Sequence, residues 1–399
     1  MTFVRAIRRA RAAVALGVVG VTGAVLMAIV SWQRLWSSLG NPDAFFGGDL
    51  VAYIEAAKRL TATGSPYHAA VLAGPIENIV ANVPIGYLYP PPLAQLFVPL
   101  VDLPHLGLAW VWFATQAVAI VLLAPLVWRA AGGTMSPPAA MALAFVLLSS
   151  WPLAFALFGG NVSAWIAIGV AVMLVARGRV AGAVAASLAL LKLTPSPLLI
   201  VAIASRAARL PAALTAVAVG LVSIALSPGA WTDWIRALPN IARNPPSSGT
   251  ANLSPTAAGS ILGWPEAGLA VGLALTIGFG FAALIVAVRS GLTLPTISAA
   301  TFAYLFASPT LWDHHAAAAV PLMVGGWPGG NRATRLVILA NVAWAPTIWI
   351  GFHAPVVTLL LLVMLGLTLV VPAVVREVQS VRAPGSAGRA ASPEDSAPV

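Results

Sequence analysis

The chain has 399 residues, of which 60% are hydrophobic and 8% are charged, and its formal net charge is +10. A soluble domain of this size does not need so apolar a composition, so most of the chain is expected to lie in a membrane. The basic residues stand in short clusters between apolar runs, a pattern typical of membrane topology signals rather than of nucleic-acid binding. The absence of cysteine excludes disulfides, thiolate metal sites and a cysteine nucleophile.

The hydropathy pattern predicts an all-α polytopic membrane protein with about 12 transmembrane helices. The first apolar run is close to the length of a full span, so we interpret it as a retained helix and not as a cleaved signal peptide. Three segments are too short to cross a membrane alone and are expected to be broken or half helices, namely 180–191, 195–205 and 316–327. The other predicted spans are 12–30, 106–128, 138–158, 162–176, 211–228, 266–288, 292–310, 337–352 and 355–375.

Arginine-bearing connections set the predicted orientation. With the N-terminus inside, these connections fall on the cytoplasmic side if the Pro-rich piece "YPPPLAQLFVPLVDLP" (89–104) is a re-entrant segment that dips into the membrane and returns. One transmembrane domain is then predicted over 1–378, with a disordered cytoplasmic tail over 379–399. The protein is expected in the cell membrane, as a multi-pass protein of the bacterial inner membrane.

The same orientation sends most of the unexpected polar residues to the outer face. An extracytoplasmic active site set into a membrane bundle is expected to show this convergence. The outward pieces are the loop 31–90, "FGGNVS" (158–163), "KLTPSP" (192–197), the loop 229–265, "SPTLWDHH" (308–315) and "GFHAP" (351–355).

A juxtamembrane helix is predicted from Asp49 to Leu60, in the first outer loop. At 100° per residue, Asp49 and Tyr53 share the apolar face of this helix, whereas Arg59 falls on the opposite, charged face. Asp is also a favoured helix N-cap, although Ala52 provides no capping box. A lone acid at the head of an apolar face favours a functional role over a cap.

Lys192 is one of two lysines in the chain and lies inside the apolar run "LALLKLTPSPLLI". A lysine at such depth is costly unless it reaches the interface or meets an anion. Pro195 and Pro197 suggest a helix end near the surface, which fits an interfacial anchor. Phosphate or other anion binding is an equal alternative.

The segment "SPTLWDHH" ends in Asp313, His314 and His315. Adjacent helical residues point about 100° apart, so only one histidine is expected to face a given ligand. Metal binding is a weak hypothesis here, since there is no HExxH motif and no i,i+4 histidine pair. The segment is either a solvated loop or a contact for a substrate phosphate or an acceptor hydroxyl.

Two further elements carry candidate substrate contacts. Asn161 in "GNVS" suits a sugar hydroxyl, but it suits a helix N-cap slightly better. Tyr89 in "YLYPPP" belongs to a class of aromatics that commonly sit at the membrane interface. The sequence contains no P-loop, no GxSxG motif and no Rossmann signature.

Taken together, "GGDLVAYIEAAKRLTATGSPY", "YPPPLAQLFVPL", "GNVSAWIAI", "GRVAGAVAASLALLKLTPSPLLI" and "SPTLWDHHAAAAVPLM" resemble glycosyltransferase family 87. This family comprises membrane mannosyltransferases that include polyprenol-phosphate-mannose-dependent enzymes. The resemblance covers most of residues 45 to 325, in order and spacing. The pair Gly160-Asn161 departs mildly from the family, in which Gln more often follows this glycine.

The resemblance implies a GT-C type helical bundle with its site on the outer face and an inverting, metal-independent sugar transfer without a cofactor. By this likeness Asp49 is the candidate general base and His314 or His315 lines the site. The implied partners are a polyprenyl-phosphate sugar donor, a lipid-linked or glycan acceptor and the membrane lipids, with no nucleic acid.

The predicted mechanism is transfer of a sugar, with mannose favoured over arabinose or another pentose, in which Lys192 neutralises the leaving phosphate. If Lys192 is only an anchor, the outward arginines Arg59, Arg236 and Arg243 or the histidines take that role. A secondary transporter and a scaffold protein without chemistry are the alternatives from other classes. A transporter is expected to show an inverted repeat and mid-membrane polar groups, whereas here these groups gather at one face.

Overall fold

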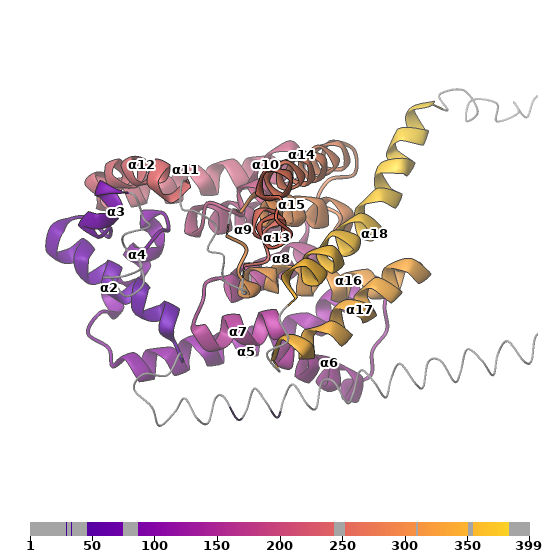
Figure 1. Cartoon of the computed structure of the whole chain (residues 1–399), viewed down its shortest axis with the longest axis horizontal. Coiled ribbons are helices and arrows are strands. Elements are labelled where there is room, and N and C mark those ends of the chain that lie inside the picture. The colour runs from indigo at the N-terminus through magenta and orange to yellow at the C-terminus, as the bar shows by residue number, and fades with distance from the viewer. Residues whose placement is uncertain are drawn as a thin grey trace, which may run out of the picture.

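The computed structural model describes residues 46–74, 87–242, 252–308, 310–349 and 354–382, together with positions 29 and 33. The regular elements in these ranges are all helices (Figure 1). In chain order they are α2 (Gly48–Thr63), α3 (Ala69–Ala73), α4 (Pro91–Phe97), η2 (Val98–Leu100), α5 (His105–Ala130), α6 (Pro137–Ser149), α7 (Trp151–Gly159), α8 (Ser163–Ala176), α9 (Gly178–Leu191), α10 (Ser196–Ala204), α11 (Arg209–Leu226), α12 (Pro228–Ala242), α13 (Pro255–Ile261), α14 (Pro265–Ser290), α15 (Leu294–Ala307), η3 (Asp313–Ala319), α16 (Val320–Gly329), α17 (Arg332–Trp349) and α18 (Pro355–Arg382).

The all-helical class of the fold is confirmed, but the count of about 12 membrane-spanning helices is not. Within the described ranges, α5, α11, α14 and α18 are long and apolar enough to cross a membrane, which makes four spans, or five if the bent pair α6–α7 counts as one. The predicted spans between 162 and 327 include helices of 14, 9 and 10 residues (α8, α10 and α16). At 1.5 Å per residue these helices are shorter than the hydrocarbon core, which is about 30 Å thick.

The span predicted over 138–158 is broken. Its two halves, α6 and α7, meet at Ser150 with a bend of 66°. Pro152 stands in the first turn of α7, where its missing N–H and its ring prevent the helix from continuing through. The predicted span thus consists of two helices, because composition alone does not locate such a break.

The predicted loops contain more helix than expected. The piece 89–104 forms α4 and η2, two short helices rather than one long one. The outer loop 229–265 contains α12 and α13, which were not predicted. Ala230 and Ala237, seven residues apart on α12, are fully buried, whereas Ile235 is 62% exposed, so α12 is amphipathic.

Two predictions concern the chain ends. The first predicted span (12–30) lies outside the described residues, apart from position 29. At the other end, α18 continues to Arg382, past the predicted domain boundary at 378, and the remainder of the tail also lies outside the described residues.

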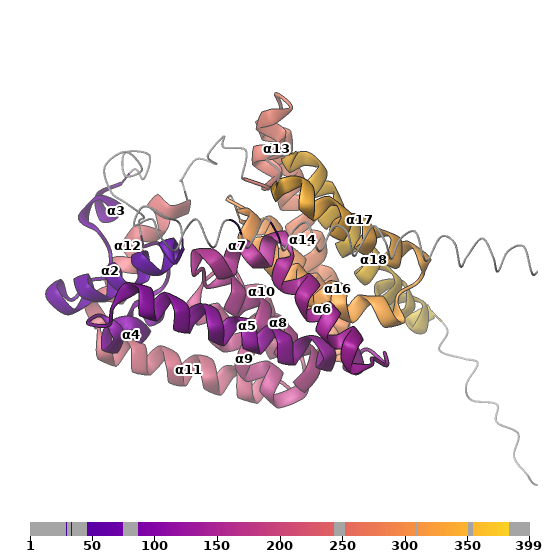
Figure 2. The same ribbon diagram turned by 90° about the horizontal axis from the view of Figure 1, so that it is seen from below.

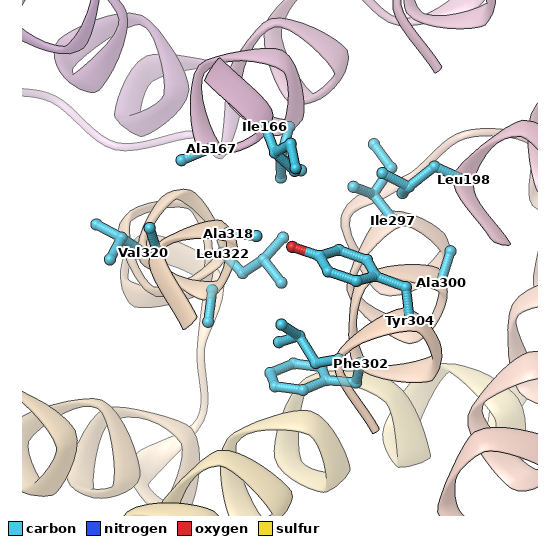
Figure 3. Packing of buried hydrophobic residues seen from close by; sticks show 14 of the residues in the cluster. Ile166, Ala167, Leu198, Ile297, Ala300, Phe302, Tyr304, Ala318, Val320 and Leu322 are labelled. Carbon is cyan, nitrogen blue, oxygen red and sulfur yellow. The ribbon is translucent and has the colours of Figure 1, made fainter. Parts of the chain in front are cut away.

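The main core surrounds α15. Every residue of α15 from Thr296 to Phe306 is buried. Figure 3 shows side chains of α8, α10, α15 and the η3–α16 segment meeting in this core, among them Ile166, Leu198 and Tyr304. Alanines on α15 and η3 let these backbones approach closely, as small residues do between membrane helices.

A second apolar cluster joins α2, α4, α12 and the first turns of α5. These elements lie at one end of the bundle, and α17 and α18 lie at the other, in both views (Figures 1 and 2). The core of this cluster includes Leu50, Tyr53 and Leu60 of α2, with Phe97 of α4. The helix predicted from Asp49 to Leu60 is therefore present, and its predicted apolar face is the buried one.

Candidate active site

The Gly-Gly-Asp sequence lets α2 begin in close contact with the turn between α7 and α8. Gly47 has the left-handed conformation (φ 72°), and its N–H donates to the carbonyl of Phe158 at 2.8 Å. A Cβ on Gly47 would lie 2.9 Å from the Cβ of Ala109. Gly160, also left-handed (φ 68°), approaches so closely that its own added Cβ would lie 3.2 Å from the Cα of Gly47. Only glycine fits either position, and their contact brings Asp49 against Asn161.

Asn161 holds the carboxylate of Asp49. Its Nδ2 donates to Oδ2 of Asp49 at 2.9 Å. Its Oδ1 accepts from the backbone N–H of Ser163 at 2.8 Å, which fixes the amide orientation at the start of α8. Asn161 therefore lies one residue before the cap position of α8, which belongs to Val162, and the donor end of its amide is directed at the acid. Asp49 itself does not occupy the cap position of α2, which belongs to Gly47.

The environment raises the pKa of Asp49. Burial of the carboxyl disfavours its charged form and is the largest cause, while the hydrogen bond from Asn161 and the charge of Lys192 act in the opposite direction. The result is a carboxyl group with a pKa above its ordinary value. A carboxylate of this kind is a stronger base than an exposed one.

Two tyrosines, Tyr53 and Tyr89, pack together near Asp49. Tyr53, one turn further along α2, is fully buried, and its hydroxyl accepts from the backbone N–H of Val162 at 3.1 Å. Tyr89 packs edge-on against Tyr53, with 5.4 Å between the ring centroids. Burial raises the pKa of the Tyr89 hydroxyl to about 12, and interactions with the side chains of Tyr53 and Asn161 act in the opposite direction. The predicted residues of α2, of "YLYPPP" and of "GNVS" therefore form one continuous network.

Lys192 enters the same network from the end of α9. The helix ends at Leu191 and Lys192 is extended, which directs its chain away from the helix axis. Its Nζ lies 2.8 Å from Nε2 of His315 and 5.4 Å from the centroid of the Tyr89 ring. The charges of Asp49 and Lys192 each affect the pKa of the other, although the two side chains form no direct ion pair. Burial lowers the pKa of Lys192 to about 7, against the effect of Asp49.

The two adjacent histidines have different contacts, and only His315 lies within hydrogen-bond distance of Lys192. Burial is the largest cause that lowers the pKa of His315, and a neutral imidazole can accept at Nε2 from a protonated Lys192. The ring of His314 lies 4.5 Å from that of His315 and 5.7 Å from that of Phe155, between centroids. Its Nδ1 is buried and has no hydrogen-bond partner among the described residues.

Asp313 lies on the other side of this segment. It is 2% exposed and lines an apolar cavity of about 280 Å³ together with Trp151 and Trp344. Trp151 stacks on Phe155, the ring that contacts His314. Two aromatic side chains, Trp151 and Phe155, therefore lie between the cavity and His314.

Arg59 is the predicted site residue that the structure does not bring to this cluster. Its Nε donates to the carbonyl of Pro66 at 3.0 Å, which ties the end of α2 to the chain that follows. Of the other outward arginines, Arg236 forms a 3.7 Å ion pair with Asp233 on α12, and Arg243 lies outside the described residues.

Asn252 is a residue that sequence reasoning missed. It is fully buried, and its Oδ1 accepts from the backbone N–H groups of Leu311 and Ser254, both at 3.0 Å. A backbone bond from Leu253 to Leu311 completes a short bridge that holds the segment before the histidines. The signal was an Asn two residues before a Ser-Pro helix start, in a piece read as a loop.

No group of three or more His, Asp or Glu side chains in the described part of the chain is arranged to hold a metal ion. The cluster instead combines a buried carboxylate, a buried amine in contact with an imidazole, and an amide. Such groups can accept a proton, neutralise an anion and bind hydroxyls.

Comparison with known proteins gives the family. No curated protein and no solved structure is significantly similar to the chain. The family model of glycosyltransferase family 87 matches residues 87–311, more than half of the chain. The match contains Tyr89, Asn161 and Lys192, while Asp49 and the histidines lie outside its two ends. The chain therefore belongs to glycosyltransferase family 87 and is a membrane glycosyltransferase.

Proposed function

We propose that the protein transfers a sugar, mannose in the first place, from a polyprenyl-phosphate donor to a hydroxyl of a lipid-linked or glycan acceptor on the outer face of the cell membrane. The observation that carries the proposal is the meeting of Asp49 and Lys192 in one cluster, with Asn161 bonded to the acid and His315 to the amine. A base and a cation in one cluster are what displacement of a phosphate leaving group requires.

The reaction is an inverting substitution at the anomeric carbon. Asp49 accepts the proton of the acceptor hydroxyl while the acceptor oxygen forms a bond to the anomeric carbon. The bond from that carbon to the phosphate oxygen breaks on the opposite face, and its electron pair remains on the phosphate. Lys192 stabilises this growing negative charge, which lowers the barrier because the charge is largest in the transition state. The scheme requires one carboxylate, unlike the two of a glycoside hydrolase.

Lys192 is suited to a phosphate because its ammonium is buried but not paired directly with a carboxylate. Its Nζ contacts the His315 imidazole and the Tyr89 ring, both uncharged in this arrangement. A buried cation is costly without an anion, so an incoming phosphate recovers part of that cost. The apolar cavity beside Asp313 supports a donor with a hydrocarbon chain, since Trp151, Trp344 and aliphatic side chains line it.

The test is incubation of the purified protein with radiolabelled polyprenyl-phosphate mannose and, in parallel, polyprenyl-phosphate arabinose, each with a membrane lipid extract. Label from the mannose donor is expected in a product with an inverted anomeric centre, and the Asp49→Asn protein should form about 10² to 10⁴ times less of it. Label from the arabinose donor alone would replace mannose in the proposal. No labelled product from either donor would contradict it.

A further inference from the structure

Another pocket, lined mostly by apolar residues but also by two arginines, lies at the end of the bundle opposite Asp49. It has a volume of about 720 Å³ and is enclosed by the ends of α5, α8, α16 and the start of α17, with α18 along one side. Helix α8 begins next to Asn161 and ends just before Arg177, which lines this pocket. Its 14 residues separate the pocket from the active-site cluster by about 20 Å, at 1.5 Å per residue. The pocket is therefore distinct from the glycosyl-transfer site.

Two arginines give the pocket its charge. Arg177 and Arg376 both line it, and the described residues of its lining include no Asp or Glu. Arg177 is the one residue other than glycine with positive φ (48°) in the described ranges, a strained conformation for an L-residue. Its guanidinium donates to the carbonyl of Ala130 at 3.2 Å, which uses one of its five N–H groups. A residue with this strained backbone therefore contributes a cation to the lining of the pocket.

Further polar side chains of the pocket come from the start of α17. Oδ1 of Asn331 accepts from the backbone N–H of Thr334 at 2.9 Å, which caps the helix. The hydroxyl of Thr334 lies 3.4 Å from the carbonyl of Thr368, which Pro372 leaves without its usual helical donor. Side chains that line the pocket thus form hydrogen bonds with the backbone N–H at the start of α17 and with the carbonyl that Pro372 leaves unpaired.

An apolar stripe leads into the pocket along α18. Five apolar side chains of α18, each at least 45% exposed, are spaced three or four residues apart. They therefore share one face of the helix. The last two of them also line the pocket. The five are Leu360, Met364, Leu367, Val371 and Val375. The stripe covers about 22 Å, more than the hydrocarbon depth of one leaflet, which is about 15 Å.

We propose that this pocket binds the phosphate of an anionic membrane lipid between Arg177 and Arg376, with an acyl chain of that lipid along the apolar stripe of α18. Guanidinium groups bind phosphate through two parallel N–H donors, and the adjoining hydrocarbon matches the chain of a lipid but not a soluble phosphate. The N-terminal segment is an unsuitable occupant because it carries Arg5, Arg8, Arg9 and Arg11. The tail after Arg382 carries Glu394 and Asp395 and is the competing occupant.

The test measures the thermal unfolding midpoint of the full-length protein in a neutral detergent during titration with dioleoylphosphatidylglycerol or dioleoylphosphatidylcholine. A ligand of the folded state raises the midpoint, so each titration gives an apparent dissociation constant. Phosphatidylglycerol should bind at least about tenfold more tightly than phosphatidylcholine, and Arg177→Gln and Arg376→Gln should each weaken it about tenfold or more. Arg376 lies on a regular helix, so its variant tests the site without altering the strained backbone.

Three controls separate the occupants. Arg179→Gln removes a neighbouring exposed arginine outside the pocket and should leave the constant unchanged. Glycerol 3-phosphate should not raise the midpoint, and a chain that ends at Arg382 should bind phosphatidylglycerol as the full chain does.

Unchanged binding by both arginine variants, or an equal effect of glycerol 3-phosphate, would overturn the lipid site. A tenfold gain in affinity on truncation would instead assign the pocket to the tail. None of these outcomes depends on transferase activity.

Discussion

Nδ2 of Asn161 lies 2.9 Å from Oδ2 of Asp49, across the contact between two left-handed glycines. Because Oδ1 of the same amide is committed to the N–H of Ser163, the amide cannot rotate away from the acid without losing both bonds. The start of α8 therefore fixes the position of a carboxylate on α2, 112 residues away in the chain. A base held in this way is positioned before the acceptor arrives.

Asn161→Ala should reduce kcat/KM by about 10- to 100-fold, since a hydrogen bond to a charged group is worth about 1.5–3 kcal/mol. Asn161 is a positioning residue, so a second readout is needed. Loss of its N–H donor removes an interaction that lowers the pKa of Asp49, so the acid limb of the kcat/KM profile should move to higher pH. Ser163→Ala is the matched control, because its buried hydroxyl has no hydrogen-bond partner among the described residues. An unmoved acid limb would show that Asn161 only stabilises the turn.

Lys192→Met keeps the length of the side chain and removes its charge. If the ammonium binds the leaving phosphate, turnover should fall about 10²- to 10³-fold and free polyprenyl phosphate should compete more weakly. Lys192→Arg should retain part of both, because a guanidinium also binds phosphate, with a different geometry. Lys58→Met is the control, since Lys58 is the second lysine of the chain and forms an exposed pair with Glu55. An unchanged inhibition constant for Lys192→Met would make Lys192 an interfacial anchor.

The pH profile of kcat/KM should be bell-shaped and narrow. Activity falls as pH decreases through the raised pKa of Asp49, because the base becomes protonated. It falls again as pH increases past the pKa of Lys192, about 7, because the ammonium loses its proton. In Lys192→Arg the alkaline limb should disappear, since a guanidinium remains charged. Persistence of the same alkaline limb in Lys192→Arg would assign that limb to another group.

Helix positions were predictable from this sequence, but the number of membrane spans was not. Runs of apolar residues locate α5, α11, α14 and α18 well. The same signal does not distinguish a span from a shorter buried helix such as α15, whose surroundings are protein on every side. A local break such as the one at Ser150 depends on how Pro152 is placed, and α12 has the amphipathic pattern of a surface helix within a piece read as a loop.

The residues that form the site were easier to predict from the sequence than the contacts between them. Rare polar residues in an apolar chain stand out, and Asp49, Asn161 and Lys192 were identified in this way. Pairings such as Lys192 with His315 join segments 123 residues apart, and no local pattern encodes them. Asn252 was missed because its role is to satisfy backbone groups of a distant segment, and Arg59 was included although its partner is the neighbouring Pro66.

The predicted orientation can be tested with single cysteines, because the chain contains none. Ala62→Cys, on the exposed face near the end of α2, should react with a membrane-impermeant thiol reagent in intact cells. Arg179→Cys and Arg332→Cys, at the arginine-bearing end of the bundle, should react only after the membrane is opened. Reaction of Arg179→Cys in intact cells would reverse the orientation and place Asp49 on the cytoplasmic side.

The central claim is that Asp49 is the general base, and Asp49→Asn tests it most directly because it keeps the size of the side chain and removes the basic group. The measurement is the single-turnover rate of sugar transfer from polyprenyl-phosphate mannose, with donor binding determined on the same protein. Transfer should fall about 10²- to 10⁴-fold while the donor binds with an affinity close to that of the wild type. Transfer at a rate near that of the wild type would contradict the account and make His314 the leading candidate for the base.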